Sequence, residues 1–109
     1  MQIIETNIFT KCITNLISDD EYAEFQNMLI ANPLKGDLIV GSGGCRKIRY
    51  RLANKGKSGG IRVIYYYISE DGIIYMLYVY PKNQQDNLSQ EQCNKLKALT
   101  LLLKEWNYH

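Results

Sequence analysis

The residues best suited to chemistry in this sequence are a run of cations near its middle. The segment from position 38 to position 69 contains no carboxylate, and its cationic residues are Arg46, Lys47, Arg49, Arg51, Lys55, Lys57 and Arg62. Acidic residues gather earlier in the chain, at Asp19, Asp20, Glu21 and Glu24. The net charge is only +2, yet one surface should be positive and another negative. Such a positive patch indicates a polyanionic or acidic partner.

Arginine and lysine side chains can support cleavage of RNA through its own 2′-hydroxyl. That reaction needs the hydroxyl deprotonated, the charge on the phosphorane neutralised and the leaving 5′-oxygen protonated. An arginine fork matches the phosphorane oxygens. Neighbouring cations lower the pKa of a lysine below its usual value of about 10.4, so that the lysine can act as an acid or a base. A strand lined with lysine and arginine is also typical of a solvated sheet face, so the cations alone leave both interpretations open.

Other catalytic patterns are missing from the sequence. The only histidine is His109, at the last position, which excludes a ribonuclease mechanism based on two histidines. We find no phosphate-binding glycine loop, no serine-hydrolase motif and no paired carboxylates in a glycosidase-like setting. The cysteines, Cys12, Cys45 and Cys93, lack metal-site spacing and are predicted to be buried free thiols. We therefore expect chemistry without a metal or cofactor.

Length and composition predict a single domain spanning residues 1–109. Hydrophobic residues make up 46% of the chain and charged residues 22%, which is ordinary for a globular protein. The first residues contain no basic leader, and no apolar run reaches the roughly 18 residues of a membrane span. A cytoplasmic protein without a membrane partner is expected.

The first third of the chain predicts a short strand and two helices. Residues 2–5 form an apolar run, and apolar residues then recur at helical spacing from Ile8 to Ile17. Residues 18–33 are a clearer helix, because Ser18 and Glu21 form a capping box and Pro33 ends the segment. Its predicted buried stripe consists of Tyr22, Phe25, Met28 and Leu29.

The middle of the chain predicts strands. Residues 37–44 are expected to form a short strand and a glycine turn, and residues 45–52 a strand with strict alternation. Its apolar side has Ile48, Tyr50 and Leu52, and its cationic side has Lys47, Arg49 and Arg51.

Asp71-Gly72 predicts a two-residue type I′ hairpin turn between two further strands. In that register Glu70 pairs with Ile73, and Arg62 lies opposite Pro81. The pairing should stop at Pro81 and release Lys82 into a loop. The predicted faces of the hairpin are Ile64, Tyr66, Ile68, Leu77 and Val79 on one side, and Val63, Tyr65, Tyr67, Met76 and Tyr78 on the other.

Both of these faces are apolar, so helices should cover the hairpin on both sides. Residues 89–106 supply a last helix with Ser89 as its N-cap and Gln92 three residues on. Its predicted buried stripe is Cys93, Leu96, Leu99, Leu103 and Trp106. The expected class is α+β, with two N-terminal helices, a central antiparallel sheet and a C-terminal helix.

Several motifs, in this order, resemble the HigB-like branch of the RelE/ParE superfamily of type II toxins. They are "GGCRKIR", "KGKSGG", "GIRVIYY" and "YPKNQQDNLSQEQ", and the resemblance covers nearly the whole chain. It implies a RelE-like fold and a toxin that cuts mRNA on the translating ribosome. It also implies a cognate antitoxin as partner, expected to be HigA-like with a DNA-binding domain.

The resemblance also implies roles for individual cations. Arg62 matches the strand arginine that contacts the scissile phosphate, Lys47 and Arg49 match two cations on the preceding strand, and Lys82 falls where RelE has an arginine. These four form the predicted catalytic set, and Arg46, Arg51, Lys55 and Lys57 form the predicted RNA-binding set. A tyrosine of RelE would fall near Leu88, which can neither stack as an aromatic nor donate a proton, so Lys55 or Lys57 is a candidate to share its role.

Two other functions remain open at the level of the sequence. The superfamily includes ParE-like inhibitors of DNA gyrase, which bind their target without cutting nucleic acid. A ribosome- or RNA-binding inhibitor of translation without nuclease activity would also fit the cationic segment.

Overall fold

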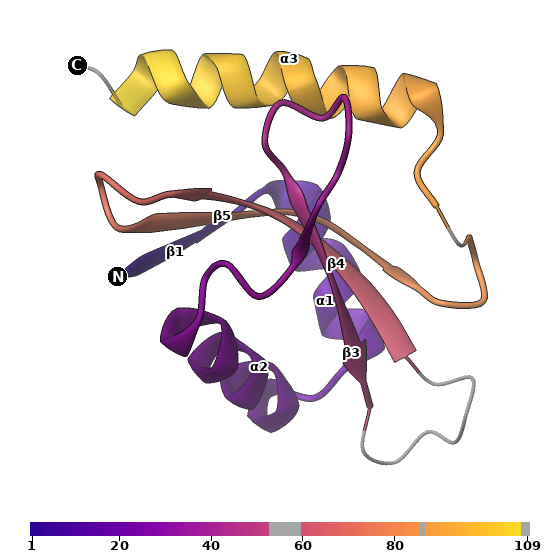
Figure 1. Ribbon diagram of the computed structural model, residues 1–109. Coiled ribbons are helices and arrows are strands. Elements are labelled where there is room, and N and C mark those ends of the chain that lie inside the picture. The colour runs from indigo at the N-terminus through magenta and orange to yellow at the C-terminus, as the bar shows by residue number, and fades with distance from the viewer. Residues whose placement is uncertain (53–59, 86, 108–109) are drawn as a thin grey trace.

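A twisted sheet with helices on both faces forms the centre of the fold (Figure 1). The computed structural model describes residues 1–52, 60–85 and 87–107. The elements in this part of the chain are β1 (Gln2–Glu5), α1 (Asn7–Leu16), α2 (Asp19–Ala31), β2 (Asp37–Leu38), β3 (Arg46–Arg51), β4 (Gly60–Ile68), β5 (Ile73–Pro81) and α3 (Gln90–Asn107). The predicted α+β class and the placement of the helices before and after the main strands are confirmed.

The described strands form one sheet in the order β1-β5-β4-β3-β2. Strands β2 to β5 pair antiparallel, as predicted, whereas β1 pairs parallel with β5 from Gln2 opposite Ile73. Strand β2 is limited to Asp37–Leu38, because residues 40–44 form a turn and a bend in which Gly41, Gly43 and Gly44 adopt positive φ. The sheet is therefore mixed, with its one parallel pairing at the β1 edge.

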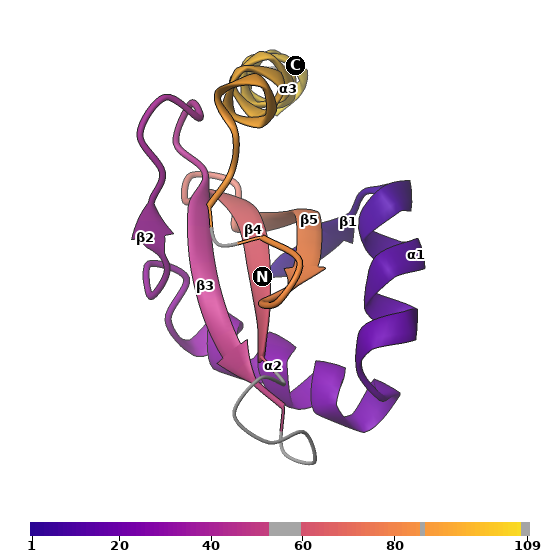
Figure 2. The same ribbon diagram turned by 90° about the vertical axis from the view of Figure 1, so that its right-hand side faces the viewer.

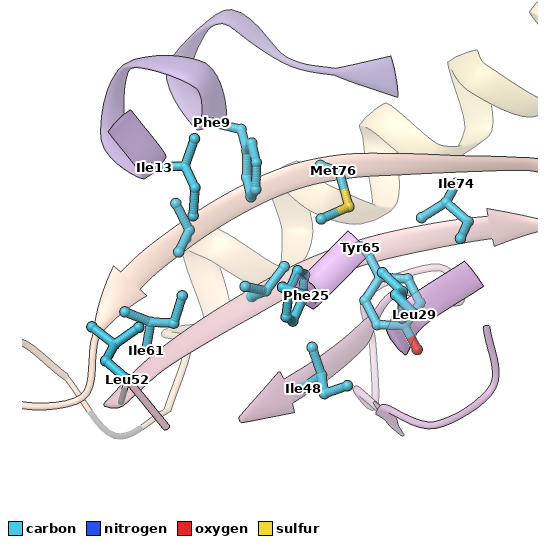
Figure 3. Packing of buried hydrophobic residues seen from close by; sticks show 12 residues of the cluster. Phe9, Ile13, Phe25, Leu29, Ile48, Leu52, Ile61, Tyr65, Ile74 and Met76 are labelled. Atoms are coloured by element: carbon cyan, nitrogen blue, oxygen red, sulfur yellow. The ribbon is translucent and has the colours of Figure 1, made fainter. Parts of the chain in front are cut away.

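Helices α1 and α2 cover one face of the sheet (Figure 2). The Thr6 hydroxyl accepts a hydrogen bond from Phe9 N at 3.1 Å, and the Ser18 hydroxyl accepts one from Glu21 N at 3.2 Å, so each helix has a side-chain N-cap. The core of this face contains Phe9 and Ile13 from α1 together with Phe25 and Leu29 from α2 (Figure 3). The predicted capping box and the apolar stripe of α2 place that helix correctly.

Helix α3 covers the opposite face. The Gln92 backbone donates to Ser89 Oγ at 3.1 Å, and the Ser89 backbone donates to Gln92 Oε1 at 2.9 Å, which confirms the predicted cap. Cys93 and Leu96 are buried, and Leu99 and Leu103 pack partly against the second core. Trp106 is 77% exposed, so its predicted burial is wrong. The helical stripe continues into the last turns of α3, but the last fully buried residue of the helix is Thr100.

The β4–β5 turn differs from the prediction. Ile68 pairs with Ile73, which leaves residues 69–72 as a four-residue loop, and Glu70 does not pair with Ile73. A type I′ turn needs positive φ at both central residues. Gly72 has φ of 64°, but no described non-glycine residue has positive φ, so Asp71-Gly72 cannot form the predicted turn.

A β-bulge in β5 then shifts the register again. Tyr65 pairs with Met76, and Ile64 pairs with Tyr78, so Leu77 is an extra residue. The Leu77 carbonyl accepts a hydrogen bond from Thr6 Oγ1 at 2.9 Å. The bulge exchanges the predicted faces of the next two residues: Val79 packs in the core under α1 and α2, and Tyr78 packs against the core under α3.

Beyond the bulge, Tyr80 rather than Pro81 lies opposite Arg62. Strand β5 ends at Pro81, as predicted. The following residue keeps one link to the sheet, because Lys82 N donates to Gly60 O at 2.9 Å. Within the described residues, no helix is both long and apolar enough to cross a membrane.

Candidate functional site

The alternation of β3 places three of its cations, Lys47, Arg49 and Arg51, on the α3 face of the sheet. Ile48 and Leu52 are buried in the core under α1 and α2, and Lys47, Arg49 and Arg51 point to the other side, as predicted. Helix α3 crosses this face away from the end where β3 stops and β4 begins (Figure 1). The cations near that end of the sheet are therefore left uncovered by α3.

A cavity of about 240 Å³ lies at this end of the sheet. We call it the basic cleft, and its lining residues are Arg49, Tyr50, Arg51, Gly60, Arg62 and Lys82. They come from three segments, which are β3, the first residues of β4 and the turn after β5. Folding thus brings together four cations that are up to 33 positions apart in the sequence, from residue 49 to residue 82.

Arg62 holds the central position in the cleft. It lies directly opposite Arg49 on β3 and opposite Tyr80 on β5. Its residue is only 9% exposed, and in the described part of the chain the one salt bridge joins Lys95 to Glu91. The guanidinium is therefore not held in a structural ion pair with any described carboxylate.

Gly60 has no side chain, so the space beside the Arg62 guanidinium is left free. A Cβ atom at position 60 would lie 3.7 Å from Arg62 Nη1. Side chains two residues apart on a strand share a face, so any larger residue at position 60 would lie beside the arginine. The backbone bond from Lys82 to Gly60 fixes the turn after β5 at the same place.

The electrostatic consequence is a site that favours a bound anion. Like charges directly opposite each other on neighbouring strands repel. A phosphate group accepts parallel hydrogen bonds from a guanidinium fork and relieves the repulsion between neighbouring cations. In the described residues, no group of three or more His, Cys, Asp or Glu side chains is placed to hold a metal ion.

Comparison with known proteins assigns the family. A sequence model described as the RelE toxin of the RelE/RelB toxin–antitoxin system matches residues 1–108. The chain belongs to the RelE toxin family. Its fold is similar to that of a free-state E. coli toxin RelE mutant with two arginines replaced by alanine, with a TM-score of 0.57 and 17% identity over 77% of this chain and 85% of that chain.

The intact E. coli RelBE toxin–antitoxin complex gives a similar result. The match has a TM-score of 0.56 and 20% identity, and it covers 72% of this chain and 93% of that chain. At these identities the likeness to both structures concerns the fold.

The predicted site residues of this RelE-family chain do not all lie in the basic cleft. Arg49, Arg62 and Lys82 from the predicted catalytic set lie there, together with Arg51 from the predicted RNA-binding set. Lys47 lies on the same face of β3 but lines a neighbouring cavity, and its Nζ is 3.3 Å from Asn87 Oδ1. Lys55 and Lys57 lie outside the described residues.

Arg46 has a different environment from the other predicted cations. Its Nη1 donates hydrogen bonds to Leu34 O at 3.2 Å and to Gly36 O at 2.7 Å. Residues 46 and 47 point to opposite faces of β3, so Arg46 ties this strand to the segment that follows α2. Arg46 is therefore not among the residues that line the basic cleft.

Sequence reasoning missed Gly60 and Tyr50 as lining residues. Gly60 stands two positions before Arg62, and that spacing was the available signal. Tyr50 belongs to the apolar side of β3, where its ring meets Phe25 edge-on at 5.1 Å, yet it also contributes to the cleft. Burial, followed by the charges of Glu24 and Glu21, raises the pKa of Tyr50.

Tyr65 and Cys45 are buried residues with structural hydrogen bonds. Tyr65 is fully buried, and its hydroxyl donates to Pro33 O at 2.7 Å and accepts from Gly36 N at 2.9 Å. Cys45 is also fully buried, and burial raises the pKa of its thiol to about 11. The predicted burial is confirmed for Cys45 and Cys93, whereas Cys12 is partly exposed.

Proposed function

We propose that this protein is a toxin that cuts mRNA on the ribosome, and that it acts without a metal ion. The observation that carries the proposal is the gathering of Arg49, Arg51, Arg62 and Lys82 around one cleft, with Arg62 outside any ion pair among the described residues. This arrangement suits one phosphate of an RNA strand and the phosphates next to it.

The cleavage step follows from the chemistry of these groups. The 2′-oxygen attacks the adjacent phosphorus, and the bond from phosphorus to the 5′-oxygen breaks, leaving a 2′,3′-cyclic phosphate and a 5′-hydroxyl. Arg62 neutralises the charge that develops on the phosphorane, and Arg49 and Lys47 hold the strand. Lys82 takes part in proton transfer between the attacking and leaving oxygens. Arg51, Lys55 and Lys57 contribute further contacts to phosphate.

The ribosome supplies what this site lacks. Arginine and lysine are weak acid–base catalysts near neutral pH, so the free protein should be a slow nuclease. A ribosome that holds the message in one orientation provides proximity, which can contribute several orders of magnitude in rate. Within the family we assign the chain to the HigB-like branch, on the order of its basic motifs. A cognate HigA-like antitoxin with a DNA-binding domain would neutralise it in the cytoplasm.

The decisive experiment is translation in vitro with the purified protein, followed by primer extension on the message. Wild type should produce cuts in translated mRNA and few cuts in free RNA. Arg62→Ala should remove the cuts while circular dichroism and thermal unfolding show an intact fold. An unchanged cleavage pattern in that variant refutes the assignment. Stalled translation with intact message would instead indicate a non-catalytic inhibitor, and loss of gyrase supercoiling would indicate a ParE-like poison.

A further inference from the structure

A second cavity lies beside the basic cleft on the same face of the sheet. We call it the side cavity; it has a volume of about 330 Å³, and its lining includes Val40, Lys47, Asn87, Leu88 and Gln90. Lys47 precedes Arg49 by two residues on β3, a distance of roughly 7 Å along a strand. That distance is comparable to one nucleotide of an extended RNA strand, so a strand held at Arg49 can reach the side cavity.

One wall of the side cavity is a firmly built loop. The buried Ser42 hydroxyl donates to Ile39 O at 2.7 Å and accepts from Cys45 N at 3.1 Å. Gly43, with φ of 77°, packs so closely on α3 that a Cβ atom there would collide with Thr100 Oγ1. On this fixed loop Val40 is 95% exposed, so an apolar side chain is held out in solvent at the cavity.

The other wall is fixed by the amide network that begins α3. Gln85 Nε2 donates to Asn87 O at 3.0 Å and to Gln92 Oε1 at 3.1 Å. The network fixes Asn87, whose Oδ1 accepts from Lys47 Nζ, in the lining of the cavity. Its neighbour Leu88 packs partly in the core under α3 and also lines the cavity.

We propose that the side cavity binds one unpaired nucleobase of the RNA whose phosphate lies in the basic cleft. This inference rests on the proposed function and adds a specificity site to it. Val40 and Leu88 offer apolar contact to the face of a base. The Asn87 Nδ2 group can donate to a base edge, and its Oδ1, which accepts from Lys47 Nζ, has a second lone pair for the same edge. Ligand sites commonly combine apolar walls with a few fixed polar groups of this kind. Lys47 lines the side cavity and lies two residues before Arg49 of the basic cleft, so its charge can neutralise the phosphate next to the bound base.

A binding experiment tests the inference without depending on cleavage. The probes are 2′-deoxy trinucleotides, which lack the attacking 2′-hydroxyl and therefore cannot be cut. Each probe carries an abasic sugar at one of its three positions. We expect one abasic position to weaken binding to wild type by about tenfold or more at low salt. The same abasic change should weaken binding to Asn87→Ala and Val40→Ser much less than binding to wild type. Asn15→Ala, on an exposed part of α1, is the matched control and should behave as wild type.

The outcomes separate this inference from the proposed function. If binding is lost in Arg62→Ala but no abasic position distinguishes wild type from Asn87→Ala, the cleft binds RNA and the side cavity does not read a base. If wild type cuts mRNA and Asn87→Ala changes the bases found next to the cuts, both proposals gain support. If wild type binds no probe and cuts no message, the proposed function and the inference fall together.

Discussion

Arg49 and Arg62 lie directly opposite each other on neighbouring antiparallel strands, at the end of the sheet that α3 leaves open. Like charges that face each other on neighbouring strands destabilise a sheet. Arg62 is also largely buried, and no described carboxylate pairs with it. The arrangement is unfavourable in the free protein and becomes favourable when a polyanion enters, as is common where a binding site is kept at the expense of stability.

Replacing the central arginine should therefore stabilise the fold while removing the activity. Arg62→Met keeps most of the side-chain stem and deletes the charge, so we expect the free energy of unfolding to rise by about 1 kcal/mol. For a domain of this size the corresponding rise in Tm is about 4–8 °C. Thermal unfolding measures the change, and Lys104→Met, at an exposed cation on α3, should leave Tm nearly unchanged. A clear fall in Tm for Arg62→Met would assign this arginine a structural role.

Salt dependence should distinguish the cations of the cleft from Arg46. Each lost phosphate contact on single-stranded RNA reduces the slope of log K against log salt by about 0.7. Arg49→Gln and Lys82→Gln should each reduce the slope by this amount. Arg46→Gln should leave the slope unchanged but lower stability by about 1–3 kcal/mol, because two hydrogen bonds from a charged group to backbone carbonyls are lost. Fluorescence anisotropy with a labelled oligonucleotide between low and moderate salt measures the slopes, and equal slopes for all variants would contradict the assignment of the cleft.

The alternation of β3 was predictable because it depends on neighbouring residues alone. Ile48 and Leu52 are apolar and pack in the core, and strand alternation then places Lys47, Arg49 and Arg51 on the other face. The caps of α2 and α3 were predictable for the same reason, since each involves residues three positions apart.

The bulge at Leu77 was not predictable from local sequence. Its carbonyl is satisfied by Thr6, a residue 71 positions away that joins β1 to α1. The prediction therefore gave Arg62 the wrong partner, Pro81 in place of Tyr80, and assigned Tyr78 and Val79 to the wrong faces. The environment of Arg46 has a similar origin, because its acceptors, Leu34 and Gly36, lie in the segment between α2 and β2.

Enlarging Gly60 should close the approach to Arg62 step by step. A methyl group at this position makes ordinary contact with the guanidinium, so Gly60→Ala should reduce cleavage only slightly. Gly60→Val should reduce it about tenfold or more, because a branched side chain fills the space that a phosphate oxygen needs. Glycine is unfavourable within a strand, and the added Cβ would lie 3.4 Å from Tyr50 O, so Gly60→Ala should be about as stable as wild type. Cleavage assays and urea unfolding on the same preparations test this, and full activity in Gly60→Val would place the phosphate elsewhere.

The contact between Tyr22 and Glu5 should control stability at alkaline pH. The Tyr22 hydroxyl donates to Glu5 Oε2 at 2.6 Å, and Thr10 Oγ1 donates to Glu5 Oε1 at 2.6 Å, so one carboxylate connects β1, α1 and α2. Burial, and then the hydrogen bond to Glu5, raises the pKa of Tyr22 well above its ordinary value. Because the folded-state pKa is the higher one, this contribution is complete below about pH 10, the pKa of an unfolded tyrosine, and is lost as the pH rises beyond it.

Tyr22→Phe should therefore be less stable than wild type at pH 7, by about 1–2 kcal/mol, and should lose less stability between pH 9 and about pH 11. Glu5→Gln is the matched variant, since it keeps an acceptor for the hydroxyl but removes the charge that opposes ionisation of Tyr22. Some alkaline loss should persist in both variants, because burial also raises the pKa of Tyr65. In Glu5→Gln the burial of Tyr22, which is the largest cause of its raised pKa, remains as well. Urea unfolding at several pH values gives the slopes, and parallel curves for wild type and Tyr22→Phe would show that this hydroxyl does not carry the alkaline transition.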